Sequence, residues 1–163
     1  GRDVSIECRI MVRRITSKPL YVEVWNETGH APVRVLFNPA GKLLLAHGRR
    51  TEEVAEYSTD CWYDLGIRVM TDRHRFELTV NGRLIGVDQD YQGEKPRDAT
   101  WYFRTPAREV CRFVLRTESD SDVPRLDDIV HEGNDVANPS ARTEASTYFV
   151  ESVTIRSNGG DPA

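Results

Sequence analysis

Alternation of apolar and polar residues with a period of two is the feature of this sequence that most restricts its fold. In residues 4–12 (VSIECRIMV) and 20–25 (LYVEVW) the even positions are apolar. Residues 63–69 and 76–80 alternate in the same way on either side of a polar turn at 71–74. Successive side chains of a strand point to opposite faces, so each segment is predicted to be a strand with one face in a core and one face toward water.

Turn signals separate these segments. Asn81-Gly82 directly follows Val80, and Asn-Gly favours the left-handed dihedrals of a type I′ turn. Residues 51–57 fit either a short helix that begins at Thr51 or a strand. Roughly ten to twelve strands, about 8–12 residues apart, predict an all-β sandwich or barrel. The other expected strands are 33–37 and 42–47, on either side of the turn 38–41, and 84–87, 101–104, 110–117, 126–131 and 148–156.

The size and charge of the chain limit its organisation and its partners. Its 163 residues fit one domain, which is expected to span residues 1–156 and to be followed by a flexible tail at 157–163 (SNGGDPA). The net charge of -4 provides no broad positive field, so nucleic acid is not expected as a partner. No apolar run approaches the ~20 residues of a membrane-spanning helix, so no membrane insertion is expected.

The three cysteines are widely separated, at Cys8, Cys61 and Cys111. They form no C-x-x-C pair, which argues against a zinc site. Each lies in phase with apolar neighbours, and a free cysteine behaves as a small hydrophobic core residue. Three buried, unreactive thiols are therefore expected.

A family resemblance rests on two adjacent motifs and on a third segment closer to the C-terminus. Residues 57–69 (YSTDCWYDLGIRV) and 76–82 (FELTVNG) resemble the central hairpin of concanavalin A-like lectin/glucanase domains, among them the laminin-G-like jelly rolls. Residues 126–129 (LDDI) are similar to the strand that often precedes the closing strand of such domains, here 148–155. The resemblance implies an all-β fold in which two antiparallel sheets stack as a jelly-roll sandwich, one of them concave. In this family, ligands commonly lie across the concave sheet or at the rim loops.

Outward-facing side chains suggest a binding site. If the even positions of 20–25 face the core, the odd positions carry two aromatic rings and a carboxylate to the other face. Such rings cover the apolar C–H face of a sugar, and charged groups hydrogen-bond its hydroxyls or a uronic carboxylate. The alternative is an ordinary solvated face with rings packed under loops. The predicted ligand-binding residues are Tyr21, Glu23, Trp25, Arg9, Asp64 and Arg68.

Catalytic motifs of the resembling enzymes are missing. Glycoside hydrolysis usually needs two carboxylates about 5–9.5 Å apart. The jelly-roll glucanases carry them in a Glu-x-Asp-x-(x)-Glu strand, and the related alginate lyases use Gln-x-His; neither motif occurs here. No catalytic residue is predicted. A carboxylate pair from separate strands, such as Glu23 with Asp64, is the alternative.

Two motifs suggest other ligands or modifications. Asp120, Asp122 and Asp127 offer the hard oxygen ligands that calcium accepts, and related jelly rolls often hold a structural calcium ion. They are the predicted metal ligands. Asn26-Glu27-Thr28 is a glycosylation sequon.

These observations lead to a ranked functional prediction. The first is a noncatalytic carbohydrate-binding or accessory module of a polysaccharide-processing protein. Its partners would be a glycan or polysaccharide and other domains of a parent protein, and its location extracellular or periplasmic. Two alternatives stay open: a divergent glycoside hydrolase or polysaccharide lyase of the same fold, and a structural or protein-binding laminin-G-like domain.

Overall fold

The strands form two antiparallel sheets. The structure is a computed structural model that describes residues 3–15, 18–86, 100–117 and 147–158. A 3-10 turn, η1 (Thr71–Arg73), connects two of the strands. The strands are β1 (Asp3–Arg14), β2 (Leu20–Asn26), β3 (Val33–Phe37), β4 (Lys42–His47), β5 (Arg50–Glu56), β6 (Trp62–Met70), β7 (Arg75–Val80), β8 (Arg83–Leu84), β9 (Trp101–Tyr102), β10 (Val110–Arg116) and β11 (Thr147–Asn158).

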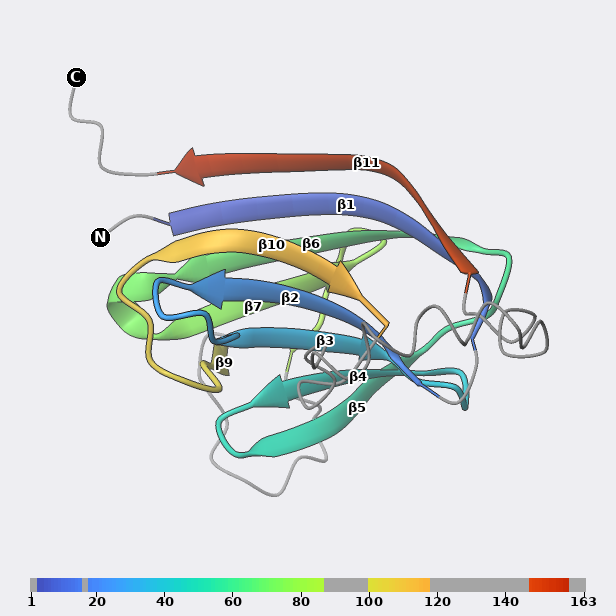
Figure 1. The fold of residues 1–163 in the computed structure, drawn as a ribbon, viewed down its shortest axis with the longest axis horizontal. Coiled ribbons are helices and arrows are strands. Elements are labelled where there is room, and N and C mark those ends of the chain that lie inside the picture. The colour runs from blue at the N-terminus through green and yellow to red at the C-terminus, as the bar shows by residue number, and fades with distance from the viewer. Residues whose placement is uncertain (1–2, 16–17, 87–99, 118–146, 159–163) are drawn as a thin grey trace, which may run out of the picture.

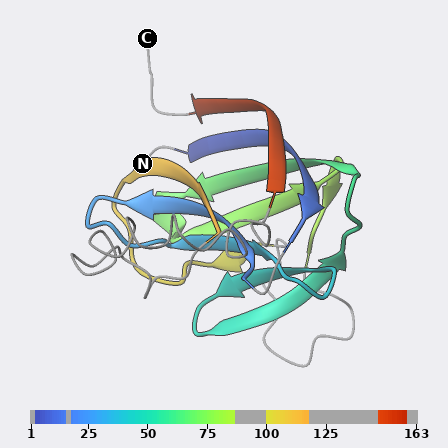
Figure 2. The ribbon, with the colours of Figure 1, turned by 45° about the vertical axis from the view of Figure 1, so that its right-hand side comes forward.

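The two sheets stack as layers of a sandwich (Figures 1 and 2). The six-stranded sheet has the order β11-β1-β6-β7-β8, and β9 also pairs with β7. The five-stranded sheet has the order β10-β2-β3-β4-β5. Because β1 and β2 follow each other in sequence but lie in different sheets, the chain crosses from one layer to the other between them. The predicted all-β, two-sheet antiparallel sandwich is confirmed.

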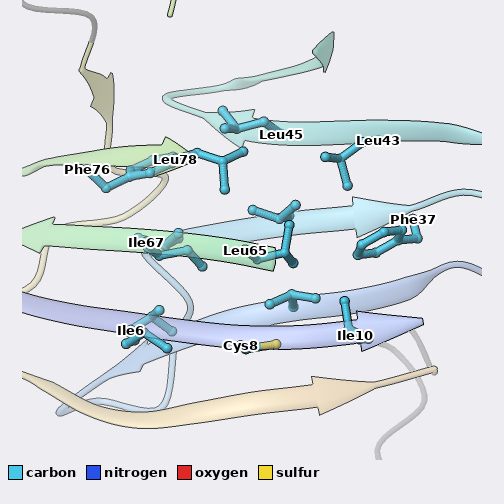
Figure 3. Close-up of a cluster of buried hydrophobic side chains, with 14 of the residues drawn as sticks. Ile6, Cys8, Ile10, Phe37, Leu43, Leu45, Leu65, Ile67, Phe76 and Leu78 are labelled. Carbon is cyan, nitrogen blue, oxygen red and sulfur yellow. The ribbon is translucent and has the colours of Figure 1, made fainter. Parts of the chain in front are cut away.

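The core lies between the layers, where the apolar faces of both sheets meet (Figure 3). The even positions of β2 are buried as predicted, with Leu20, Val22 and Val24 no more than 1% exposed. In the other sheet, Ile10 and Val69 are completely buried. Burial of such side chains contributes about 1.5–3 kcal/mol each. The period of two in the sequence therefore identified the core face of these strands.

Some elements differ from their predicted form. Residues 51–57, for which a helix and a strand were both open, lie largely in strand β5, which pairs with β4. The expected strands at 84–87 and 101–104 are represented by the two-residue strands β8 and β9. Strand β11 continues to Asn158, whose Cα pairs with that of Asp3. The expected strand at 126–131 lies outside the described residues.

The Asn81-Gly82 turn has the predicted backbone conformation. The φ angles are 50° at Asn81 and 77° at Gly82, both in the left-handed region that type I′ turns require. Val80 pairs with Arg83 across the turn. The Asn81 side-chain Oδ1 also accepts a hydrogen bond of 2.8 Å from the backbone N–H of Asp64. The turn is thereby tied to β6, and it fixes the register of the hairpin.

The cysteine prediction is correct for one residue and wrong for two. Cys8 is buried in the core, whereas Cys61 and Cys111 are exposed. Burial, with a smaller contribution from the Asp64 carboxylate, raises the pKa of the Cys8 thiol to about 11. Cys61 precedes β6 and Cys111 lies on β10, the edge strand of its sheet. The register of β10 against β2 is irregular between Val110 and Arg112, so Cys111 is out of phase with the inward residues that follow it, and alternation alone cannot reveal such an irregularity.

The difference in exposure predicts two classes of thiol reactivity. At pH 8 the native protein should react with two equivalents of iodoacetamide, at Cys61 and Cys111, because only exposed thiolates are attacked rapidly. Cys8 should react after denaturation. Intact-mass measurement of the labelled protein, with peptide mapping, checks this expectation. Labelling of Cys8 at the rate of the other two in the native state would contradict the described core.

No helix in the described residues is long and apolar enough to span a membrane.

Candidate functional site

The outer face of the five-stranded sheet carries the polar row of β2. Tyr21, Glu23 and Trp25 lie on the face of β2 opposite to the core, as predicted. The two aromatic residues are half-buried, but Glu23 is 0% exposed. Full burial of a carboxylate is costly unless charged partners compensate it. The surroundings of Glu23 therefore decide what this row can do.

Two arginines from neighbouring strands compensate the buried carboxylate. Arg34 on β3 is the direct cross-strand partner of Glu23, and its Nε donates to Oε2 at 2.7 Å. Arg116 on β10 pairs across the strands with Tyr21, and its Nε donates to Oε1 of Glu23. The Trp25 Nε1 lies 3.4 Å from the same Oε1. Charge-assisted hydrogen bonds of this kind are among the strongest in proteins, so Glu23 holds both arginines in place.

The same two arginines lie against the ring of Tyr21. The Cζ atoms of Arg34 and Arg116 lie 5.2 Å and 4.3 Å from the ring centroid, within the range of cation–π contacts. Their side chains are 13% and 18% exposed. We call these five residues the Glu23 cluster: Tyr21, Glu23, Trp25, Arg34 and Arg116. These five residues supply two guanidinium groups, one carboxylate and two aromatic rings.

Sequence reasoning found three of the five cluster residues and missed both arginines. Arg34 and Arg116 occupy outward positions of strands in which apolar and polar residues alternate. The alternation therefore assigns them to a polar face and says nothing more about their neighbours. Their proximity to Glu23 depends on the pairing of β2 with β3 and with β10. Arg116 is 93 residues from Glu23 in sequence, and the alternation pattern carries no information on such long-range pairing.

The structure does not bring the six predicted site residues together. Arg9 lies on β1, and Asp64 and Arg68 lie on β6, all in the six-stranded sheet, whereas the β2 row belongs to the other sheet. Their outward side chains therefore lie on the opposite outer face of the sandwich. The expectation of a single site that combines the β2 row with Arg9, Asp64 and Arg68 is wrong. Alternation within a strand shows which side chains point outward, but it does not show to which sheet the strand belongs. A carboxylate pair formed by Glu23 and Asp64 is excluded for the same reason.

On that opposite face the three residues make ion pairs. Arg9 contacts Glu151 at 2.8 Å and Asp64 at 3.9 Å. Arg68 contacts Asp3 at 2.6 Å, and this hydrogen bond raises the pKa of the guanidinium. All of these groups are substantially exposed, so the pairs contribute little to stability. They do set the positions of the charges on this face.

Residues 101–104 combine aromatic rings with an arginine, and their contacts are mainly structural. Trp101 is 2% exposed, and its Nε1 donates to the backbone oxygen of Ile85 at 2.9 Å. Arg104 donates to the backbone oxygen of Ala31 at 3.2 Å. Tyr102 is exposed and carries the Arg75 guanidinium over its ring. Trp101 thus closes one edge of the sandwich.

The side chain of Asn26, the acceptor residue of the glycosylation sequon, makes hydrogen bonds within the protein. Asn26 is 5% exposed, and its Nδ2 donates to the backbone oxygen of Pro106 at 2.9 Å. Its Oδ1 accepts hydrogen bonds from the backbone N–H groups of Thr28 and His30. A glycan on Nδ2 would break the contact with Pro106. The side chain of Asn26 therefore acts in the turn, and the folded protein does not present it for modification.

The predicted metal ligands cannot be compared with the structure. Asp120, Asp122 and Asp127 lie outside the described residues. Within the described ranges there is no group of three or more His, Cys, Asp or Glu residues that could hold a metal ion. Calcium binding stays a prediction.

Comparisons with known proteins support the fold class and suggest a function. A family model described as "Sialidase-like, CBM domain" matches residues 1–131. A solved structure named "Sialidase" is similar with a TM-score of 0.69 and 17% identity, and covers 96% of this chain. Alginate lyase AlgAT5, from polysaccharide lyase family 7, has a TM-score of 0.53 and 10% identity over 97% of this chain. Alginate lyase A1-II' has a TM-score of 0.51 and 11% identity over 94%. No curated protein matches the chain.

The similar structures belong to longer chains. The alignment covers 13% of the sialidase chain, and 60% and 61% of the two lyase chains. At these identities the likeness concerns the fold, and it agrees with a concanavalin A-like jelly-roll sandwich.

Proposed function

This chain belongs to the sialidase-like CBM domain family, and we propose that it is a noncatalytic carbohydrate-binding module of a glycan-processing protein that binds an acidic glycan at the Glu23 cluster. The observation that carries the proposal is the buried Glu23 carboxylate, held between two guanidinium groups that also lie against the ring of Tyr21. This arrangement fixes positive charge beside an aromatic surface.

The ligand chemistry follows from the cluster. The half-buried rings of Tyr21 and Trp25 can cover the apolar C–H face of a sugar. A guanidinium group is planar and matches a carboxylate with two parallel hydrogen bonds. Guanidinium groups beside aromatic rings are the combination that recognises a carboxylated sugar, which is the ligand that we propose for this cluster. Uronic acids and other carboxylated sugars are the class that fits.

A binding role fits the cluster better than a catalytic one. Glycoside hydrolysis usually requires two carboxylates on either side of the scissile bond. The cluster supplies one, Glu23, which is completely buried and contacts both arginines. Glu23 is thus a positioning residue for Arg34 and Arg116. A hydrolase or lyase activity and a protein-binding role stay alternative predictions.

The biological context follows from the same proposal. A carbohydrate-binding module delivers an attached enzyme to its substrate, so the partners are a glycan and other domains of a parent protein. Such modules work where polysaccharides are found, and this supports the proposal of an extracellular or periplasmic location.

A glycan array with matched tryptophan variants tests the proposal. Wild type should bind carboxylated oligosaccharides, and Trp25→Ala should weaken that binding by about 2 kcal/mol, roughly thirtyfold, because a central aromatic contact is lost. Trp62→Ala removes an exposed tryptophan on the opposite face and should leave acidic-glycan binding unchanged. Full binding by Trp25→Ala would overturn the site, and no binding of carboxylated glycans by wild type would overturn the function.

A further inference from the structure

The outer face of the six-stranded sheet contains a hollow of about 370 Å³. It lies on the side of the sandwich opposite to the Glu23 cluster, and four adjacent strands, β11, β1, β6 and β7, contribute to it. We call it the Gly66 hollow. The side chains that matter here are Glu7, Arg9, Asp64, Thr79, Ser152 and Thr154.

A missing side chain at the centre of the sheet creates this hollow. Gly66 occupies an outward position of β6, between its cross-strand partners Glu7 on β1 and Thr79 on β7. A Cβ atom at Gly66 would lie 2.2 Å from Oγ1 of Thr79, so any larger residue would displace that hydroxyl. Glycine weakens a strand interior, and it often marks a place where a ligand approaches the backbone closely.

An exposed aromatic ring lies on the same face of the same strand. Trp62, Asp64 and Gly66 are successive outward positions of β6, with steps of about 7 Å. The Trp62 side chain is 37% exposed. The guanidinium of Arg9 lies 5.5 Å from its ring centroid and contacts Glu151 at 2.8 Å. The ring of Trp62, the carboxylate of Asp64 and the exposed backbone of Gly66 thus follow one another along the strand.

The polar groups around the hollow define the ligand charge that fits. Among the described residues, the hollow is lined by the carboxylates of Glu7 and Asp64 and by the guanidinium of Arg9, which also contacts the carboxylate of Glu151. Carboxylates accept hydrogen bonds from sugar hydroxyls, and the serine and threonine hydroxyls can donate or accept. The excess of negative charge repels an acidic sugar. This balance is opposite to that of the Glu23 cluster.

We propose that the Gly66 hollow is a second glycan-binding site, which takes a neutral sugar unit of a polysaccharide. One sugar ring stacks on Trp62, and hydroxyls of the adjoining units of the same chain donate to Asp64 and Glu7. The module then has two faces with different selectivity, one for carboxylated and one for neutral glycans. This inference rests on the hollow and on the nearby ring of Trp62, and it does not require a ligand at the Glu23 cluster.

Nuclear magnetic resonance titration of the ¹⁵N-labelled chain tests the second site. The probes are neutral hexasaccharides: cello-, laminari-, xylo- and manno-oligosaccharides. At least one should shift the amide signals of Asp64 and Gly66 and the indole signal of Trp62. Asp64→Asn and Trp62→Ala should each raise the dissociation constant about tenfold or more, because a charged hydrogen bond or a stacking surface is removed. Both residues are exposed, so these variants should fold.

The control is Asp72→Asn, the same chemical change on the exposed turn η1; it should bind like wild type. The second site would be overturned if the neutral glycans shifted only signals of β2, β3 and β10. It would also be overturned if none of the four probes bound. Unchanged affinity in both Asp64→Asn and Trp62→Ala would also overturn it. Trp25→Ala should keep neutral-glycan binding, which separates a failure here from a failure at the Glu23 cluster.

Discussion

Replacement of Glu23 by glutamine is expected to lower the free energy of unfolding by about 3 kcal/mol, because Arg34 and Arg116 both lose the buried negative charge to which they donate. Glu23 is completely buried, and Arg34 and Arg116 both donate to it. For a chain of this size the loss corresponds to a melting temperature lower by roughly 6–12 °C. Thermal and urea unfolding, followed by circular dichroism, measure both quantities.

Glu53→Gln provides the matched control. Glu53 also forms an ion pair, at 3.2 Å from Lys42, but its side chain is 53% exposed. Exposed pairs contribute about 0.2–1 kcal/mol, so this variant should unfold almost like wild type. Equal stability of the two glutamine variants would contradict the account of Glu23 as a buried, doubly paired carboxylate.

The largest effect on binding is expected from a variant in which all three charges of the cluster are replaced by apolar residues. Glu23→Leu, Arg34→Met and Arg116→Met together remove the carboxylate and both guanidinium groups. Apolar replacement of buried ion pairs is often neutral or stabilising, so this variant should be more stable than Glu23→Gln. Its affinity for carboxylated glycans should nevertheless fall by about 3 kcal/mol, roughly 150-fold, because the groups that pair with the ligand carboxylate are absent.

Comparison of the triple variant with Glu23→Gln separates stability from binding. A stable triple variant without acidic-glycan binding means that the three charges serve recognition rather than the fold. Calorimetric titration with a carboxylated oligosaccharide selected on the array provides the affinity, and urea unfolding provides the stability. Wild-type affinity in a folded triple variant would contradict the assignment of the ligand to this cluster.

Local patterns in the sequence predicted an all-β sandwich or barrel, and the family resemblance implied the two stacked sheets that the structure shows. Alternation in β1, β2, β6 and β7 identified the residues that face the core, and Asn81-Gly82 identified the tight turn between β7 and β8. Period two is a property of each strand by itself. Segment 51–57 stayed open between helix and strand because its Thr cap and acidic first turn suit a helix while its short length suits a strand equally, and the pairing of β5 with β4 decides its conformation.

The candidate site was predicted only in part, for a physical reason. Parity placed Tyr21, Glu23 and Trp25 on one face, but the partners of Glu23 come from β3 and β10, and sheet order is set by long-range pairing. The same limit explains why Arg9 and Asp64 were assigned to the wrong neighbours. The alternation within one strand shows which residues point outward. Which residues of other strands lie beside them depends on the order of the strands in the sheet.

A crystal structure of the protein with the carboxylated oligosaccharide that binds most tightly on the array tests the central claim most directly. The account predicts that the sugar lies over β2, β3 and β10, that its carboxylate is within hydrogen-bond distance of Arg34 or Arg116, and that its ring covers Tyr21 or Trp25. A carboxylated sugar bound on the six-stranded sheet or at a loop, with the Glu23 cluster empty, would contradict it.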